Sequence, residues 1–371
     1  MVEPTPKVSI IIPVYNVEKY LNMCLKTVTC QTLQDIEIIV VNDSTPDNSE
    51  KIINNYIAKD DRIIYIKHSS NKGHGGALNS GLRKVRGEYT WMVDSDDFID
   101  SNACHFLYNY ASYNKLDALA FSANNFQIMN GNMVFYYNGS YWYPKCLLEK
   151  VYSGPELILA AYVNNHILVT PPWAYFFNSD LIRNYSFREN VSYEDTDGVP
   201  IFLNSLKRIS CIKYTPYFRL IHDENSISYI RNVEIKISEK MMLQRFQIST
   251  SLFHYIKKNN INKNDPLAYY AFRIFTNAIM NDYSRYLLNK TAEKKKTEEV
   301  LYEIYGLMRK IYNTTSWEIY LRKSKFSSLN ANDWYNFGQY NKGLKLRFLI
   351  KLITKKLHLY NFLRTILKPN K

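Results

Sequence analysis

Three carboxylates lie within four residues at Asp94-Ser95-Asp96-Asp97, directly after the apolar run at residues 89–93. Like charges this close repel one another, and a hard cation such as Mg²⁺ or Mn²⁺ would neutralise them and bridge to phosphate oxygens. The alternative is structural, with Asp97 or Asp100 capping a helix expected over residues 102–114. Taken alone, the cluster leaves both interpretations open.

A second acidic group, Tyr193-Glu194-Asp195-Thr196-Asp197, follows about a hundred residues later. A carboxylate that faces an acceptor hydroxyl can act as a general base. A helix start, with Asp195 or Thr196 as its cap, is the alternative.

Two weaker signals lie between these groups. Asp43 follows the apolar run at residues 38–41 and can accept a hydrogen bond from the imide of a uracil ring, or shape the turn that follows it. The segment 71–81 is rich in glycine, which would let the backbone approach a ligand closely, and Lys72 within it could meet a phosphate. It lacks the Walker spacing G-x-x-x-x-G-K-[ST].

The elements expected to position these residues alternate along the first hundred positions. Strands are expected at 8–12, 36–41, 63–66 and 89–93. Helices are expected at 17–30, at 49–58 and from the glycine-rich segment to about residue 84. Near-continuous apolar strands between helices predict a parallel sheet covered on both faces. Ligands bind at the carboxyl ends of such strands. Pro13 to Asn16, Asp43 and the Asp94 cluster all fall there.

The later part of the chain changes character twice. Residues 102–230 mix a helix at 102–114, an aromatic strand at 133–137 and a helix near 155–164. From about residue 232 the periodicity is almost wholly helical. We therefore expect a domain at 1–230 and a helical C-terminal region at 231–371.

Composition narrows the chemistry. The five cysteines form no CxxC pair and lie near no histidine cluster, which argues against a disulfide framework or a zinc site. The N-terminus has no apolar signal region, and no uncharged apolar run approaches the roughly 18 residues of a membrane span. A cytoplasmic location is the resulting expectation.

The formal net charge of +13 suggests an anionic partner. Residues 334–371 hold nine Lys or Arg and no Asp or Glu. In a helix expected at 343–367, one apolar stripe opposes a basic face, the pattern of a helix lying in an anionic membrane interface. The stripe comprises Leu346, Leu349, Ile350, Ile353, Leu357 and Tyr360, and the basic face Arg347, Lys351 and Lys355. A terminal helix docked on its own protein is the alternative. No nucleic-acid-binding motif is present.

Five motifs, in order and spacing, resemble the inverting family 2 glycosyltransferases with the GT-A fold. They are the run 8–16, the Asp43 turn, Gly87-Glu88-Tyr89, Val93-Asp94-Ser95-Asp96-Asp97 and Tyr193-Glu194-Asp195-Thr196. The similarity covers about residues 7–225. It implies an α/β fold with a Rossmann-like, mostly parallel central sheet and helices on both faces, followed by the mainly helical C-terminal region.

The resemblance also implies roles for individual residues. Contacts to the nucleotide-sugar would come from Pro13, Tyr15, Asn16, Asp43, Asn71, Lys72, Asp94 and Ser95. Asp96 and Asp97 would ligate Mg²⁺ or Mn²⁺, with His222 as a third ligand or a surface residue. Asp195 would deprotonate the acceptor hydroxyl for in-line attack at the anomeric carbon. Trp173 and Glu194 would face the acceptor, although a buried role for Trp173 is equally open.

One position departs from the family pattern. Many members carry Arg where this chain has Leu78, so contacts to the diphosphate or donor sugar would differ, with Lys72 or His74 as substitutes.

The expected activity is that of a bacterial hexosyltransferase. It would move a sugar, expected from UDP, to a glycan or lipid-linked acceptor for surface polysaccharide or glycoconjugate synthesis, at the inner face of the cell membrane. A non-catalytic sugar-nucleotide or glycan-binding module and a membrane-associated scaffold are the alternatives.

Overall fold

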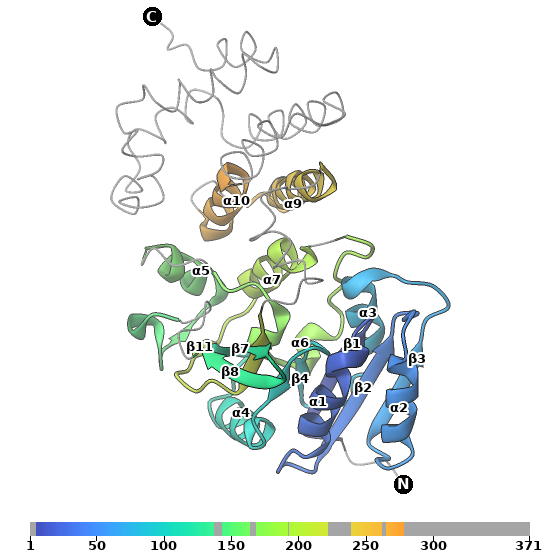
Figure 1. Ribbon diagram of the computed structural model, residues 1–371. Coiled ribbons are helices and arrows are strands. Elements are labelled where there is room, and N and C mark those ends of the chain that lie inside the picture. Colours follow the sequence, from blue (N-terminus) through green and yellow to red (C-terminus); the bar gives the residue numbers. More distant parts are fainter. Residues whose placement is uncertain are drawn as a thin grey trace, which may run out of the picture. The chain divides into compact units, whose positions relative to one another are not determined.

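The computed structural model describes residues 5–136, 143–163, 168–191, 193–221, 239–261 and 265–277 (Figure 1). The chain divides into two compact units, Met1–Leu157 with Val169–Glu234, and Ile158–Leu168 with Ile235–Lys371. The boundary expected near residue 230 and the helix expected at 343–367 lie outside the described residues, so both stay predictions. Among the described residues, no helix is both long enough and apolar enough to span a membrane.

An eight-stranded sheet forms the centre of the first unit, with the strand order β3-β2-β1-β4-β10-β6-β11-β9. The strands are β1 (Val8–Val14), β2 (Ile36–Asn42), β3 (Ile63–Lys67), β4 (Tyr89–Met92), β6 (Ala118–Ala120), β9 (Val151–Tyr152), β10 (Tyr175–Asn178) and β11 (Ile209–Cys211). The first four strands pair in parallel, as expected, and β10 runs antiparallel to both of its neighbours. Every residue of β1, β2 and β4 is buried, which explains why their sequences are mostly apolar.

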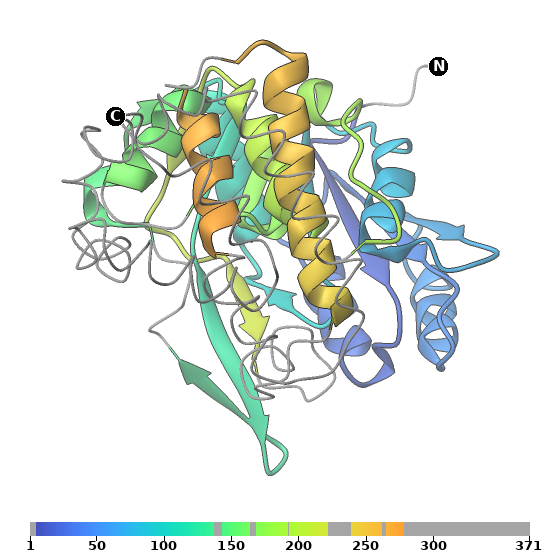
Figure 2. The same ribbon diagram turned by 90° about the horizontal axis from the view of Figure 1, so that it is seen from above.

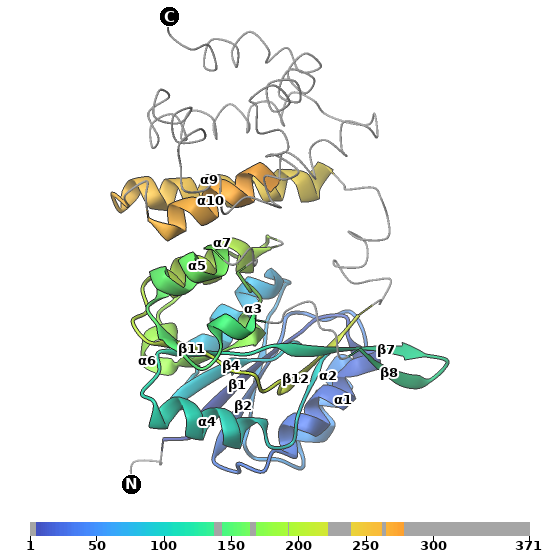
Figure 3. The same cartoon turned by 90° about the vertical axis from the view of Figure 1, so that its left-hand side faces the viewer.

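The strand order reverses at β1. The chain passes from β1 to β2 to β3 on one side and then returns to β4 on the other side. Right-handed crossovers therefore place α1 (Glu18–Thr29) and α2 (Ser49–Ile57) on one face and α3 (Gly73–Leu82) on the opposite face (Figure 3). The carboxyl ends of β1 and β4 thus flank the reversal point, the usual ligand position in open α/β sheets.

Pro13 lies inside β1 and does not end it, contrary to our expectation. The strand continues to Val14 because Pro13 pairs with β2, opposite Val41. On the β4 side, Val93 N–H donates to the carbonyl of Ile11 at 2.9 Å, and the next donor of that ladder would be Pro13, which has no N–H. Pro13 therefore ends only the pairing with β4.

A second, four-stranded sheet has the order β5-β12-β7-β8. Its strands are β5 (Phe98–Ile99), β12 (Tyr217–Leu220), β7 (Ala123–Met129) and β8 (Asn132–Tyr136). The last of these confirms the aromatic strand expected at 133–137. A turn with positive φ at Asn130 and Gly131 joins β7 to β8, and this hairpin extends from the unit (Figure 2).

The remaining helices of the first unit are α4 (Ala103–Tyr113), the short α6 (Ser179–Ile182) and α7 (Glu194–Asn204), with 3₁₀ turns at Lys145–Leu147 and Pro172–Ala174. The helix expected near 155–164 is α5 (Gly154–Val163). In the second unit, α9 (Glu239–Lys258) packs beside α10 (Pro266–Asn277). Buried Leu252 and Phe253 on α9 and Leu267 on α10 supply apolar surface there.

The glycines of α3 contact protein, whereas the sequence suggested that they admit a ligand. A Cβ on Gly75 would lie 2.2 Å from the carbonyl oxygen of Arg188, and one on Gly81 would lie 2.4 Å from Cγ2 of Ile11. Glycine is therefore required for α3 to pack closely on β1 and on the segment that precedes α7.

Candidate active site

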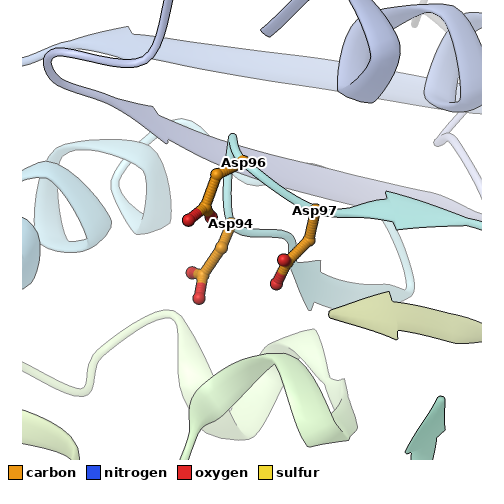
Figure 4. A group of neighbouring side chains, drawn as sticks. All are labelled: Asp94, Asp96 and Asp97. Carbon is orange, nitrogen blue, oxygen red and sulfur yellow. The ribbon is translucent and has the colours of Figure 1, made fainter. Parts of the chain in front are cut away.

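The three aspartates occupy the loop between β4 and β5. One carboxylate oxygen from each of Asp94, Asp96 and Asp97 lies within 4.8 Å of the others, a spacing that can hold a metal ion. Figure 4 shows the carboxylates of Asp94 and Asp97 turned toward the same side of the loop. Carboxylate oxygens are the donors that Mg²⁺ and Mn²⁺ prefer, so the donor set fits the expected cation.

Asp97 is held in place by the second sheet. Its Oδ1 accepts a hydrogen bond from Leu220 N–H at 2.7 Å, and the Tyr217 hydroxyl is also hydrogen-bonded to it. That hydroxyl accepts the N–H of Asp94 at 3.0 Å, which ties the loop together. The helix-cap alternative is wrong for Asp97, because the N-cap of α4 is Asn102 and Asp97 bonds elsewhere.

Burial and the charges of Asp96 and Asp94 raise the pKa of Asp97 well above its usual range. The cluster therefore resists full ionisation without a compensating charge. A bound cation would supply that charge.

His74 connects the two acidic motifs. Its Nδ1 lies 2.5 Å from Oε1 of Glu194, and its Nε2 lies 3.3 Å from Oδ1 of Asp94. Burial lowers the pKa of His74, but the charges and hydrogen bonds of Glu194 and Asp94 outweigh it and raise the pKa well above its usual value. A cationic imidazole thus lies between motifs that are a hundred residues apart in sequence.

Asp195 lies in the first turn of α7. Thr170 Oγ1 donates to its Oδ2 at 3.2 Å, and Thr196 Oγ1 donates to its Oδ1 at 3.2 Å. Burial, and then the charge of Glu194, raise the pKa of Asp195 to about 6, although His74 and the two hydroxyls act in the opposite direction. A carboxylate with a pKa near neutrality is suited to accept a proton.

The cap alternative for the second motif is also wrong. The N-cap residue of α7 is Tyr193, which adopts a left-handed conformation with φ 66°, and no side chain caps the helix. Asp195 and Thr196 are therefore not needed to start α7. A non-glycine residue with positive φ is strained, and such strain is often found at functional sites.

Asp43 follows β2 and is buried. His68 Nδ1 lies 2.6 Å from its Oδ1, and the N–H of Lys72 donates to the same oxygen at 2.8 Å. The side chain therefore also fixes the start of α3, for which Lys72 is the N-cap residue.

The other residues expected to contact the nucleotide lie at the same edge of the sheet. Tyr15 is 48% exposed just after β1. Asn16 has φ 55°, and its N–H donates to Thr45 Oγ1. Asn71 accepts the N–H of Gly73, and Ser95 is buried. The structure therefore brings these residues to the carboxyl ends of β1 to β4, as the pattern of strands predicted.

Trp173 is 3% exposed, and its ring stacks on Tyr217 at 4.5 Å between centroids. This position agrees with the buried role that the sequence left open and gives no support to sugar stacking. Leu78, which stands where many family members carry Arg, is fully buried. Of the two residues expected to substitute for that Arg, Lys72 and His74, it is His74 that lies among the acidic residues. His222 lies outside the described residues.

Sequence reasoning missed several residues that support the site. They are His68 and Ser80 beside Asp43, Tyr217 beside Asp97, and Thr170 beside Asp195. His68 could have been found, because it follows β3 as Asp43 follows β2, and Asn42 and Lys67 are paired in the two strands. The others depend on contacts between distant segments.

Comparison with known proteins agrees with this geometry. Residues 9–180 match the model for glycosyl transferase family 2. The chain is 31% identical over 227 residues to the uncharacterized glycosyltransferase EpsJ of Bacillus subtilis, covering 59% of this chain and 62% of EpsJ. It is 35% identical over 156 residues to glycosyltransferase GlyA of Streptococcus pneumoniae, covering 41% of this chain and 22% of GlyA. The chain therefore spans less than two thirds of either relative.

A solved structure shares the fold. The crystal structure of Staphylococcus aureus TarS 1–349 in complex with UDP-GlcNAc superposes with a TM-score of 0.60 at 19% identity, covering 91% of this chain and 92% of that one. The fold is therefore GT-A, as the resemblance implied. Residues 9–180 therefore carry a glycosyl transferase family 2 domain.

Proposed function

We propose that this chain is an inverting hexosyltransferase that moves a sugar from a nucleotide-sugar to an acceptor hydroxyl. The observation that carries the proposal is the bridge made by His74, whose two ring nitrogens lie 2.5 Å from Glu194 and 3.3 Å from Asp94. A cluster suited to a metal and a diphosphate therefore lies next to the motif that contains a base of raised pKa. Both are required for transfer in a single displacement.

In this proposal Asp195 removes the proton from the acceptor hydroxyl as the oxygen attacks the anomeric carbon. Because the attack displaces the diphosphate directly, the carbon is inverted and no nucleophilic side chain is needed. Asp96 and Asp97, with Asp94 beside them, would hold Mg²⁺ or Mn²⁺. The cation would supply positive charge to the departing diphosphate. Thr170 and Thr196 orient the base through their hydroxyls.

We place the nucleobase against Tyr15 and Asp43, with Asn71, Lys72 and Ser95 nearer the ribose and phosphates. A UDP-sugar is the proposed donor, on the ground that the Asp43 carboxylate can accept the imide N–H of uracil. The donor in the TarS crystal is UDP-GlcNAc. The proposed acceptor is a hydroxyl of a glycan or lipid-linked glycan, and the product belongs to polysaccharide or glycoconjugate synthesis.

A binding module without activity is the competing function. It would need the nucleotide contacts but no base, and the raised pKa of Asp195 favours an enzyme. We further propose that the enzyme acts in the cytoplasm, at the inner face of the cell membrane, and that residues 343–367, which the sequence predicts to form a basic amphipathic helix, lie on anionic lipid.

Replacing the base separates these functions. Asp195→Asn should lower the rate of sugar transfer by at least about a hundredfold, because general base catalysis contributes at least that much. Binding of the sugar nucleotide should be retained. Asp180→Asn is the matched control, since the Asp180 side chain is 83% exposed. Undiminished transfer by Asp195→Asn would refute the assignment of the base.

The rate should also depend on pH through Asp195. Only the ionised carboxylate accepts a proton, and its raised pKa is about 6, so kcat/KM should fall as the pH drops through about 6. Thr170→Val removes a hydroxyl that stabilises the ionised form and should move this fall to higher pH. The measurement is kcat/KM from pH 5 to 9 for both proteins. An identical profile for the variant would contradict the role of Thr170.

Metal removal should abolish transfer. Chelation by EDTA should stop turnover, and Mn²⁺ or Mg²⁺ should restore it. Asp96→Asn should raise the Mn²⁺ concentration needed for half-maximal thermal stabilisation by about tenfold, because a bound metal stabilises the native state. Full activity in EDTA would show that the aspartates serve another purpose.

Membrane contact can be measured without turnover. The full chain should sediment with vesicles that contain anionic lipid, and a chain lacking residues 340–371 should not, since each basic residue adds about 1 kcal/mol of attraction. Changing Arg347, Lys351 and Lys355 to Gln should weaken sedimentation in the same direction. Equal sedimentation by the full and shortened chains would rule out this helix as the membrane contact.

A further inference from the structure

A chain of hydrogen bonds ends on Asp43. Arg83 Nη2 donates to Ser80 Oγ at 2.8 Å, Ser80 Oγ lies 2.8 Å from His68 Nε2, and His68 Nδ1 lies 2.6 Å from Asp43 Oδ1. The side chains of His68 and Asp43 are only 5% and 3% exposed. Ser80 is also buried, and Arg83 reaches it from the surface.

The direction of this chain follows from its two ends. A guanidinium only donates and an ionised carboxylate only accepts, so Arg83 donates to Ser80 and His68 Nδ1 donates to Asp43. The Ser80 oxygen accepts from Arg83 and also shares a hydrogen bond with His68 Nε2.

This arrangement leaves Asp43 with one carboxylate oxygen, Oδ2, that can accept a hydrogen bond from a ligand. Oδ1 already accepts from His68 and from the N–H of Lys72 at 2.8 Å. Oδ2 receives no hydrogen bond from the described residues. Because Oδ1 is held by two donors on different elements, the carboxylate cannot rotate to exchange its oxygens without breaking both bonds.

We propose that His68, Ser80 and Arg83 are positioning residues that make Asp43 a single-acceptor contact and thereby select uracil over other nucleobases. The proposal rests on the nucleotide-sugar function above. Uracil presents one N–H, at N3, to a single acceptor. Cytosine has an acceptor at N3, which a carboxylate repels, and guanine presents two parallel N–H groups that match both oxygens of a free carboxylate.

The expected size of each effect depends on how many hydrogen bonds separate the changed residue from Asp43. Loss of the His68 donor frees Oδ1 and lets the carboxylate turn, so the effect on nucleobase selection is largest. Loss of the Ser80 hydroxyl keeps the bond between His68 and Asp43 but removes the partner of His68 Nε2, so the ring is less firmly held and the effect is smaller. Neither change touches the aspartates that would hold the metal and diphosphate.

The test compares nucleotides that differ only in the base. Binding of UDP, CDP, GDP and inorganic pyrophosphate to the full chain is measured by calorimetry in Mn²⁺. His68→Leu should weaken UDP by about tenfold, the usual scale for loss of a supporting hydrogen bond, and leave pyrophosphate within about twofold. His68→Asn, whose amide can donate in place of Nδ1, should restore the preference for UDP over CDP to within about threefold of the original.

Each outcome bears on a different claim. An unchanged ratio of UDP to CDP affinity in His68→Leu would overturn the positioning role. An equal loss of UDP and pyrophosphate would show that His68 merely supports the fold, and would also overturn it. If His68→Leu does not fold, Ser80→Ala carries the test, with a loss of about threefold expected for UDP alone. Failure of the original protein to bind any of the diphosphates in Mn²⁺ would instead contradict the proposed function.

Discussion

Pro13 has no N–H, and the ladder between β1 and β4 stops at the position where that donor would be required. The same residue still pairs β1 with β2, so the strand itself continues. Since β4 loses its partner after Val93, the chain leaves the sheet there and forms the loop that holds the aspartates. This loop and the end of β1 therefore lie on either side of the point where the strand order reverses. A missing hydrogen-bond donor thus sets where the acidic cluster stands.

Negative charge is concentrated at this point in a chain whose net charge is +13. Asp94 and Glu194 both contact the imidazole of His74, while Asp96 and Asp97 lie beside Asp94 and Asp195 is next to Glu194. Burial, and then the charges of neighbouring carboxylates, raise the pKa values of both Asp97 and Asp195. The raised pKa of Asp97 favours binding of a cation, and the raised pKa of Asp195 suits this carboxylate to accept a proton. The same crowding of buried carboxylates would therefore serve two parts of the proposed reaction.

The strands β1 to β4 and the polar residues at their carboxyl ends could largely be predicted from the sequence, because the patterns that indicate them are local. Each of the first four strands is a mostly apolar run, and Asp43 and Asp94 lie within a few residues of strand ends. The supporting residues could not be predicted in this way. The hydroxyl of Tyr217 reaches Asp94 across 123 positions, and His74 reaches Glu194 across 120. The same limit applies to Trp173, because an aromatic residue in the core and one at a sugar-binding site look the same in a sequence. Only its stacking on Tyr217 shows that Trp173 is a core residue.

The sheet order also has a consequence for the growing polypeptide. β1 to β4 are contiguous in sequence, but the neighbour of β4 on its other side is β10, where Phe176 stands opposite Trp91. The parallel half can therefore assemble from nearby segments while the antiparallel extension waits for chain made much later. Asp195 is later still. Tyr217 and Leu220, which hold the loop of Asp94 and Asp97, are made after Asp195. Both acidic motifs therefore reach their final arrangement only when nearly all of the first unit has left the ribosome.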